Sequence, residues 1–155
     1  MRRRAAKIRK IFPDAKYNEI IVSRFVNRLM NDGKKSVVEK AVYNAFKQIE
    51  NKLKKQPIDV FKEALENITP KIEVRSRRIG GATYQVPVEV SARRGSALAL
   101  KWLKNAIENI KSKDLASKIV VVILESLDNK GWAAKKKEEV FKMAEANKAF
   151  AHYKW

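Results

Sequence analysis

Arginines crowd a short segment in the middle of the chain. Arg75, Arg77 and Arg78 fall within four positions, and an aromatic residue and an amide, Tyr84 and Gln85, follow them. Guanidinium groups bind phosphates in a rigid fork, and aromatic or guanidinium planes stack on unpaired bases. Charge that protects an edge strand from aggregation would explain one or two of these arginines, but not three beside a ten-residue uncharged run. The segment therefore predicts contact with RNA or DNA.

The charge of the whole chain supports the same prediction. The 155 residues include 35 Lys and Arg against 17 Asp and Glu, which leaves a net charge of +18. Solubility of a small domain needs a net charge of only about 2–8. The excess indicates a polyanionic partner, with nucleic acid first and an anionic membrane surface second. A hydrophobic content of 45% predicts a folded core, and the length fits one domain over residues 1–155.

Catalytic and metal-binding patterns are weak by comparison. The sequence has no Cys and one histidine, His152, so neither a cysteine nucleophile nor a multi-histidine metal site is expected. Glu138 and Glu139 stand among lysines, which is typical of a solvated helix face. A phosphate-binding loop ending at Gly33 would need a glycine where Arg28 stands. We therefore expect no enzyme, no metal and no cofactor. The longest uncharged run is too short to cross a bilayer, so no membrane partner is expected.

The N-terminus predicts a flexible basic tail over residues 1–17. Its first ten residues hold six cations and no acid: Arg2, Arg3, Arg4, Lys7, Arg9 and Lys10. Charges this dense resist collapse until phosphates neutralise them, although a merely solvated terminus is the simpler alternative.

Helical spacing of apolar residues begins at about residue 18 and defines the body. Gly33 is expected to close the first helix, and Lys34 and Lys35 to form an exposed corner after it. Ser36 and Glu39 have the spacing of a capping box for the second helix, and Pro57 suits the first position of a third. A fourth helix is expected after residue 90, with Arg93, Arg94 and Lys101 outside its apolar stripe.

Two further helices are expected near the C-terminus. Residues 119–124 have the propensity of a buried strand, but their apolar set extends over residues 115–127 and Asp114 offers an N-cap, so a buried helix is predicted. The last helix is predicted over residues 133–149, with four residues turned inward: Val140, Phe141, Met143 and Ala144.

Between the third and fourth helices the period changes to two. Residues 71–79 and 82–90 are rich in β-branched residues, and Gly80-Gly81 suits a two-residue hairpin turn. A lone hairpin is marginal in water, so something outside the domain should hold its tip. The expected fold is mainly α: a bundle of about six helices with a two-stranded antiparallel β-ribbon arm over residues 71–90.

Three blocks give the sequence a strong resemblance to a known family. They are NDGKKS at residues 31–36, VRSRRIGGATYQVPVEV at residues 74–90 and AEANKAFAHYKW at residues 144–155. Together with shorter blocks in register, they resemble bacterial-type small-subunit ribosomal protein seven over essentially the whole chain. Two departures concern packing: residues 119–124 are more β-branched, and Trp132 stands where a small residue is expected. Trp132 is a candidate partner contact.

The resemblance implies a structural, non-catalytic protein that binds small-subunit ribosomal RNA and nucleates assembly of the subunit head. It implies ribosomal RNA contacts at the basic tail, at Lys34 and Lys35, at Arg75, Arg77 and Arg78, and at Arg93, Arg94 and Lys101. The ribbon tip and the C-terminal tail (residues 150–155) would approach exit-site transfer RNA and limit its release: Ile79, Gly80, Gly81, Ala82, Thr83, Tyr84, Phe150, His152, Tyr153, Lys154 and Trp155.

Further partners implied by the resemblance are small-subunit proteins nine and eleven, with messenger RNA as another candidate and no homo-oligomer. The location would be the ribosome in the cytoplasm, or the organelle matrix or stroma for an organelle-encoded chain. Two other functions are weighed against this one. The first is a DNA-architectural protein with a basic arm, which would require a dimer and an apolar side chain at the tip of the arm to insert between bases. The second is an enzyme that acts on RNA, which would require a general base.

Overall fold

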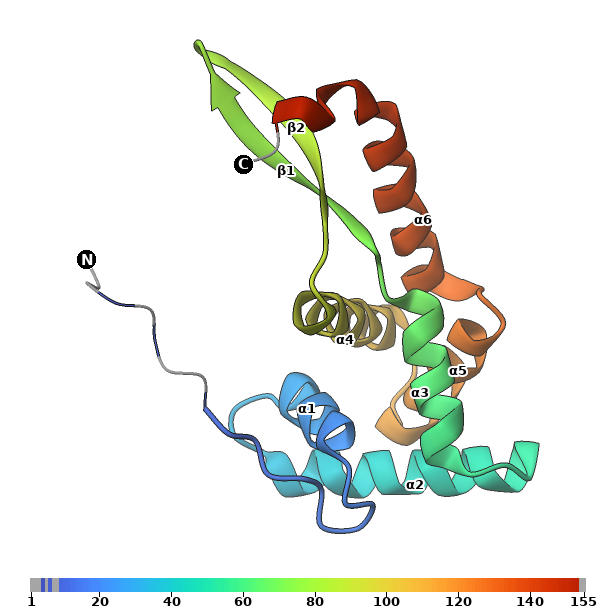
Figure 1. Cartoon of the computed structure of the whole chain (residues 1–155). Coiled ribbons are helices and arrows are strands. Elements are labelled where there is room, and N and C mark those ends of the chain that lie inside the picture. Colours follow the sequence, from blue (N-terminus) through green and yellow to red (C-terminus); the bar gives the residue numbers. More distant parts are fainter. Residues whose placement is uncertain (1–3, 5, 7–8, 154–155) are drawn as a thin grey trace.

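The computed structural model describes residues 4, 6 and 9–153 of the chain. The elements run α1 (Ile20–Leu29), α2 (Lys35–Leu53), α3 (Pro57–Ile68), β1 (Ile72–Ile79), β2 (Ala82–Glu89), α4 (Ala92–Asn109), α5 (Leu115–Leu127), α6 (Gly131–Ala146) and the 3-10 helix η1 (Lys148–Tyr153). In Figure 1 the helices form a body from which the two strands project as an arm, with α6 alongside. The predicted mainly α fold with an antiparallel ribbon is confirmed.

Aromatic side chains from three helices form the centre of the body. The ring of Phe61 lies 5.0 Å from that of Phe25 and 5.5 Å from that of Phe46, measured between centroids, and all three side chains are fully buried. They join α1, α2 and α3 into one core, against which α5 also packs. Such burial is the main favourable term in folding, so this core fixes the directions of the helices that carry the charged residues.

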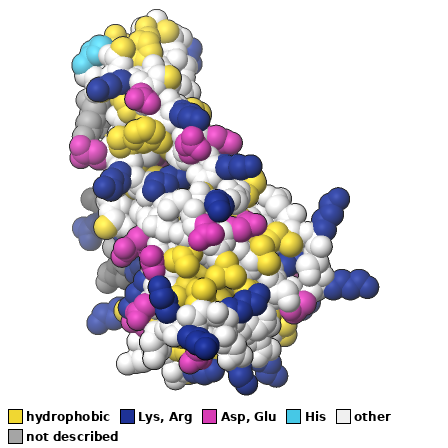
Figure 2. All heavy atoms as spheres, turned by 90° about the vertical axis from the view of Figure 1, so that its right-hand side faces the viewer, with side chains coloured by type: hydrophobic (Ala, Val, Ile, Leu, Met, Phe, Trp, Pro, Cys, Tyr) yellow, Lys and Arg dark blue, Asp and Glu magenta, His cyan; other side chains and the backbone are white. Residues whose placement is uncertain are grey.

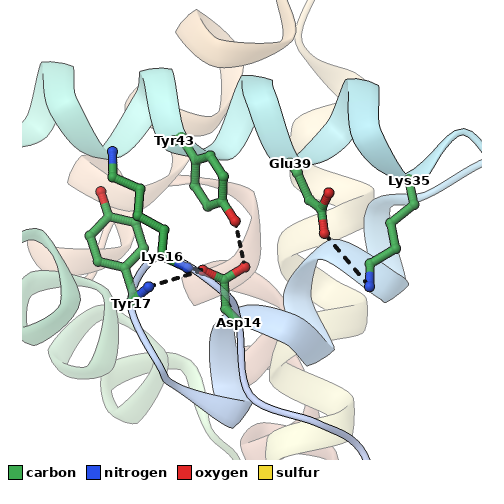
Figure 3. Close-up of polar contacts among 6 residues, drawn as sticks. All are labelled: Asp14, Lys16, Tyr17, Lys35, Glu39 and Tyr43. Atoms are coloured by element: carbon green, nitrogen blue, oxygen red, sulfur yellow. Dashed lines mark hydrogen bonds and ion pairs between the residues drawn. The ribbon is translucent and has the colours of Figure 1, made fainter.

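Two of the three predicted helix starts are confirmed and one is corrected. Pro57 is the first residue of α3, as expected. The Asp114 carboxylate accepts from the backbone N–H groups of Ala116 and Ser117 at 3.3 and 2.9 Å, and α5 is a buried helix as expected. The capping box at Ser36 is wrong, because α2 already begins at Lys35 and Ser36 lies inside its first turn. Glu39 instead pairs with Lys35, with 3.6 Å between Oε1 and Nζ (Figure 3).

The last helix differs from its prediction in position and in the residues that it buries. It spans residues 131–146 rather than 133–149, and its chain continues as η1. Ala144 is buried as expected, but Phe141 and Met143 are 55% and 46% exposed. The physical reason is that α6 extends along the ribbon, beyond most of the body (Figure 1). A two-stranded ribbon covers only a narrow stripe of the helix, and small residues occupy that stripe. No helix among the described residues is long and apolar enough to cross a membrane.

The ribbon has the predicted turn, and the chain itself supports its base. Gly80 and Gly81 have φ of +54° and +88°, the left-handed region that a two-residue hairpin turn requires. Pairing is antiparallel, with Arg77 opposite Tyr84. Val86 is fully buried, α6 packs against β1, and η1 packs against β2. The arm is therefore held from within along much of its length, and whether an outside partner holds its tip stays a prediction.

Candidate nucleic-acid interface

A basic groove lies between α1, α4 and the N-terminal segment. It has a volume of about 720 Å³, and its charged lining consists of six cations and one acid: Arg9, Arg24, Arg28, Arg93, Lys101, Lys104 and Glu108. Three of the cations, Arg9, Arg93 and Lys101, were predicted as RNA contacts. The structure adds the other three. Arg24 and Arg28 are one helical turn apart on α1, so their spacing placed them on one face, but only the packing of α4 makes that face a groove.

Most of the charge in this groove is not neutralised by the protein. Within the described ranges, Arg24, Arg28, Arg93 and Lys101 have no ion pair or hydrogen bond through their side chains. Lys104 is the exception, because its Nζ lies 3.2 Å from Asn31 Oδ1 and 3.6 Å from Glu108 Oε1. Cations held together on two helices repel one another, and a polyanion relieves that repulsion.

A second cluster of charges joins the ribbon to α4. Glu73 on β1 is 7% exposed, and its carboxylate accepts from Arg75 Nε at 2.6 Å and from Arg94 Nε at 3.2 Å. Burial opposes ionisation of this carboxyl, but the hydrogen bonds and charges of the two arginines outweigh it and hold the pKa of Glu73 below its usual value. Arg75 and Arg94 therefore stabilise the base of the arm, while about half of each side chain remains exposed.

The start of the body is fixed by Asp14, which is 6% exposed (Figure 3). Its carboxylate accepts from the backbone N–H groups of Lys16 and Tyr17, each at 3.1 Å, and from Tyr43 Oη at 2.8 Å. Burial, followed by this hydrogen bond and the negative charge of Asp14, raises the pKa of Tyr43 to about 12. Tyr17 also packs edge-on against Phe46. Asp14 and Tyr17 thus pack against α2, and the extent of the basic tail stays a prediction.

The described part of the C-terminal tail, residues 150–153, contacts the ribbon. The Arg77 guanidinium donates to the carbonyl of Tyr153. The ring of Tyr84 lies 5.3 Å from that of Phe150 and 5.1 Å from that of Tyr153, and the ring of His152 lies 4.0 Å from that of Tyr153. These contacts form one aromatic cluster on β2. Sequence spacing gave no signal for it, because the two halves are more than sixty residues apart.

The remaining predicted residues are spread over the surface. Lys34, Arg78 and Arg93 are exposed, and Lys35 is exposed but paired with Glu39. Most residues of the ribbon tip are exposed: Gly80, Gly81, Ala82 and Thr83. Arg4, Arg9 and Lys10 are exposed, whereas Arg2, Arg3, Lys7, Lys154 and Trp155 lie outside the described residues.

The α6 side of the molecule has a different charge pattern from the groove. Figure 2 shows Lys and Arg mixed with Asp and Glu around hydrophobic patches on that face. On α6 itself, Lys136 pairs with Glu139 at 2.6 Å and Lys142 with Glu138 at 2.8 Å. Lysines on α6 are thus paired with acids of the same helix, whereas the groove between α1 and α4 keeps an excess of positive charge, since six cations and one acid line it.

A helical body with an unneutralised basic groove and an arginine-bearing β-ribbon is typical of nucleic-acid-binding proteins. The family model described as ribosomal protein S7p/S5e matches residues 1–148, and the chain belongs to this family. A small ribosomal subunit protein uS7 of Ruegeria pomeroyi is 53% identical over 99% of both chains. Proteins of the same name from Rhodobacter capsulatus and Roseobacter denitrificans are 50% and 51% identical, again over 99% of both chains. The chain is a structural, non-enzymatic protein of the small ribosomal subunit.

Proposed function

We propose that this protein binds small-subunit ribosomal RNA directly, as a single RNA-binding domain, and that the groove between α1 and α4 is the main contact. The observation that supports this most strongly is the set of four groove cations without a partner among the described residues: Arg24, Arg28, Arg93 and Lys101. Phosphate contacts of this kind supply most of the affinity for nucleic acid.

The geometry of the groove suits a folded RNA. Arg24, Arg28, Arg93 and Lys101 come from two helices fixed by the same core, so the backbone positions of these cations are set before RNA binds. The ribbon projects from the body (Figure 1) and carries the exposed Arg78. A protein that contacts RNA through both the body and a projecting arm can fix the relative direction of two RNA segments. This would let it nucleate assembly of the subunit head.

The experiment is a salt series of affinities for full-length small-subunit ribosomal RNA of Ruegeria pomeroyi. Replacing Arg24 and Arg28 together by Ala should lower the slope of log affinity against log salt by about 1.4–1.8, since each lost phosphate contact removes roughly 0.7–0.9. Both side chains are exposed, so the fold should survive, which circular dichroism would verify.

The matched control is a double replacement of Lys52 and Lys55 by Ala. It removes the same charge from exposed residues at the end of α2 and in the loop that follows it, outside the groove. The control should leave the slope nearly unchanged. Equal slopes for the groove variant and the wild type would contradict the proposal.

We further propose that the ribbon tip and the C-terminal segment lie near exit-site transfer RNA and limit its release, and that small-subunit proteins nine and eleven are neighbours. The support is the aromatic cluster of Tyr84, Phe150 and Tyr153 beside Arg77, which offers stacking planes and a cation on one side of the arm. Deleting residues 150–155 should speed release of transfer RNA from reconstituted small subunits. An unchanged release rate would contradict this part of the proposal.

A further inference from the structure

Next to the groove lies a smaller hollow of about 390 Å³. Its lining is half cationic and half apolar: Arg9, Lys10, Ile11, Phe12, Ile20 and Arg24. Three of these residues, Arg9, Ile11 and Arg24, also line the groove, so the two spaces adjoin. A strand of RNA that follows the groove would therefore reach the hollow without leaving the basic surface.

The apolar side chains of the hollow are unusually exposed. Phe12 is 82% exposed, Ile20 is 45% exposed and Ile11 is 38% exposed. Within the described part of the chain, three of the eight exposed large hydrophobic side chains thus gather at one place. No other aromatic ring of the described residues contacts Phe12. Removing these apolar side chains from water would be favourable, so a partner with an apolar surface is expected to bind in the hollow.

The backbone holds Phe12 in this exposed position. Pro13 follows it, and the residue before a proline is restricted to extended conformations. One residue further, Asp14 is buried and accepts three hydrogen bonds from the body. Phe12 therefore lies two residues from the anchored Asp14, which limits the conformational entropy that Phe12 loses when a partner binds.

The charges decide which partner fits. Arg9, Lys10 and Arg24 surround the apolar side chains, and no acid lines the hollow. A nucleotide matches both features, because its base has an apolar stacking face and its phosphate is an anion. A hydrophobic protein segment would cover Phe12 but leave three cations without counter-charges. We propose that the hollow binds an unpaired nucleotide, with its base stacked on Phe12 and its phosphate beside Arg9 and Arg24. The proposal rests on the proposed RNA binding.

The experiment compares variants of Phe12 in the full chain, with the same ribosomal RNA as the probe. Phe12→Ala should weaken binding by about 5- to 150-fold, the usual range for one lost base–aromatic contact. Phe12→Leu keeps an apolar group but loses the plane, so it should remain clearly weaker than wild type, while Phe12→Trp should bind at least as well. The salt slope should not change in any of the three, because no charge is altered.

Phe141→Ala is the matched control, because Phe141 is also an exposed aromatic residue but lies on α6, outside the groove and the hollow. Its affinity should equal that of the wild type. If Phe12→Ala binds RNA like wild type while Arg24→Ala with Arg28→Ala lowers the slope, the nucleotide site is refuted and the RNA groove stands. Full affinity of Phe12→Leu would also refute stacking, since an apolar side chain of any shape would then suffice.

Discussion

Replacement of Glu73 by Gln tests how the arm is fixed to the body. The carboxylate of Glu73 is buried and accepts from Arg75 on its own strand and from Arg94 on α4. Gln has nearly the same shape but no charge, so both ion pairs are lost while the packing is kept. Hydrogen bonds to buried charged groups contribute about 1.5–3 kcal/mol each, and exposed pairs under about 1 kcal/mol. Because both arginines are about half exposed, we expect a loss of about 1–2 kcal/mol in unfolding free energy at pH 7.

The effect should depend on pH in a definite direction. The two arginines hold the folded-state pKa of Glu73 below the ordinary value of 4.5. A carboxyl with a lowered folded-state pKa contributes its full stabilisation above the unfolded-state pKa and loses it as the pH falls through the folded-state pKa. The difference between Glu73→Gln and wild type should therefore be complete at pH 6–7 and shrink in acid below about pH 4.5.

Chemical denaturation of both proteins at neutral and acid pH measures this difference. Glu89→Gln is the control, because Glu89 is an exposed carboxylate on the other strand with no ion pair among the described residues. It should change stability little at either pH. An equal loss for Glu73→Gln at pH 7 and in acid would show that shape rather than charge matters, and no loss at pH 7 would refute the ion-pair argument.

Three other predictions concern the arm and the start of the body. Replacing Arg77 and Arg78 together by Ala should lower the salt slope of RNA binding by up to about 1.4–1.8, and an unchanged slope would show that the ribbon does not touch phosphate. Tyr43→Phe should cost about 1 kcal/mol in denaturant unfolding. Because the folded-state pKa of Tyr43 is about 12, this residue's contribution should persist below pH 10 and be lost as the pH rises toward 12. Replacing Phe150 and Tyr153 by Ala should speed amide hydrogen exchange in β2, and unchanged exchange would mean that η1 does not support the arm.

The elements of the fold were predictable because local signals agreed with the tertiary structure. In α5 the β-branched residues 119–123 favour a strand, but the length of the apolar segment and the Asp114 cap favour a helix. The helix forms because its apolar residues are covered by neighbouring helices, a condition that outweighs intrinsic propensity. At the turn, Gly80 and Gly81 allow a backbone conformation that few other residues adopt, so the hairpin was predictable from two residues.

The candidate site was predictable only in part, since it depends on contacts between distant elements. The sequence places Arg24 and Arg28 on the polar face of a helix, but a solvated face would look the same. Only the packing of α4 against α1 sets them opposite Arg93 and Lys101. The exposure of Phe141 was missed for a related reason. Apolar spacing in a helix shows which residues could be buried, and it does not show how wide a face the neighbours cover.

The ribbon arginines, alike in sequence, have different roles in the structure, and this difference bears on how RNA binding should be apportioned. Arg75 serves the Glu73 cluster, and Arg77 serves the contact with Tyr153. Removing either one would alter the direction of the arm as well as a phosphate contact, so the resulting loss of affinity mixes two causes. Arg24 and Arg28 make no such contacts among the described residues. Their removal therefore measures phosphate binding alone, so the groove variant gives the cleaner count of the phosphates that the protein neutralises.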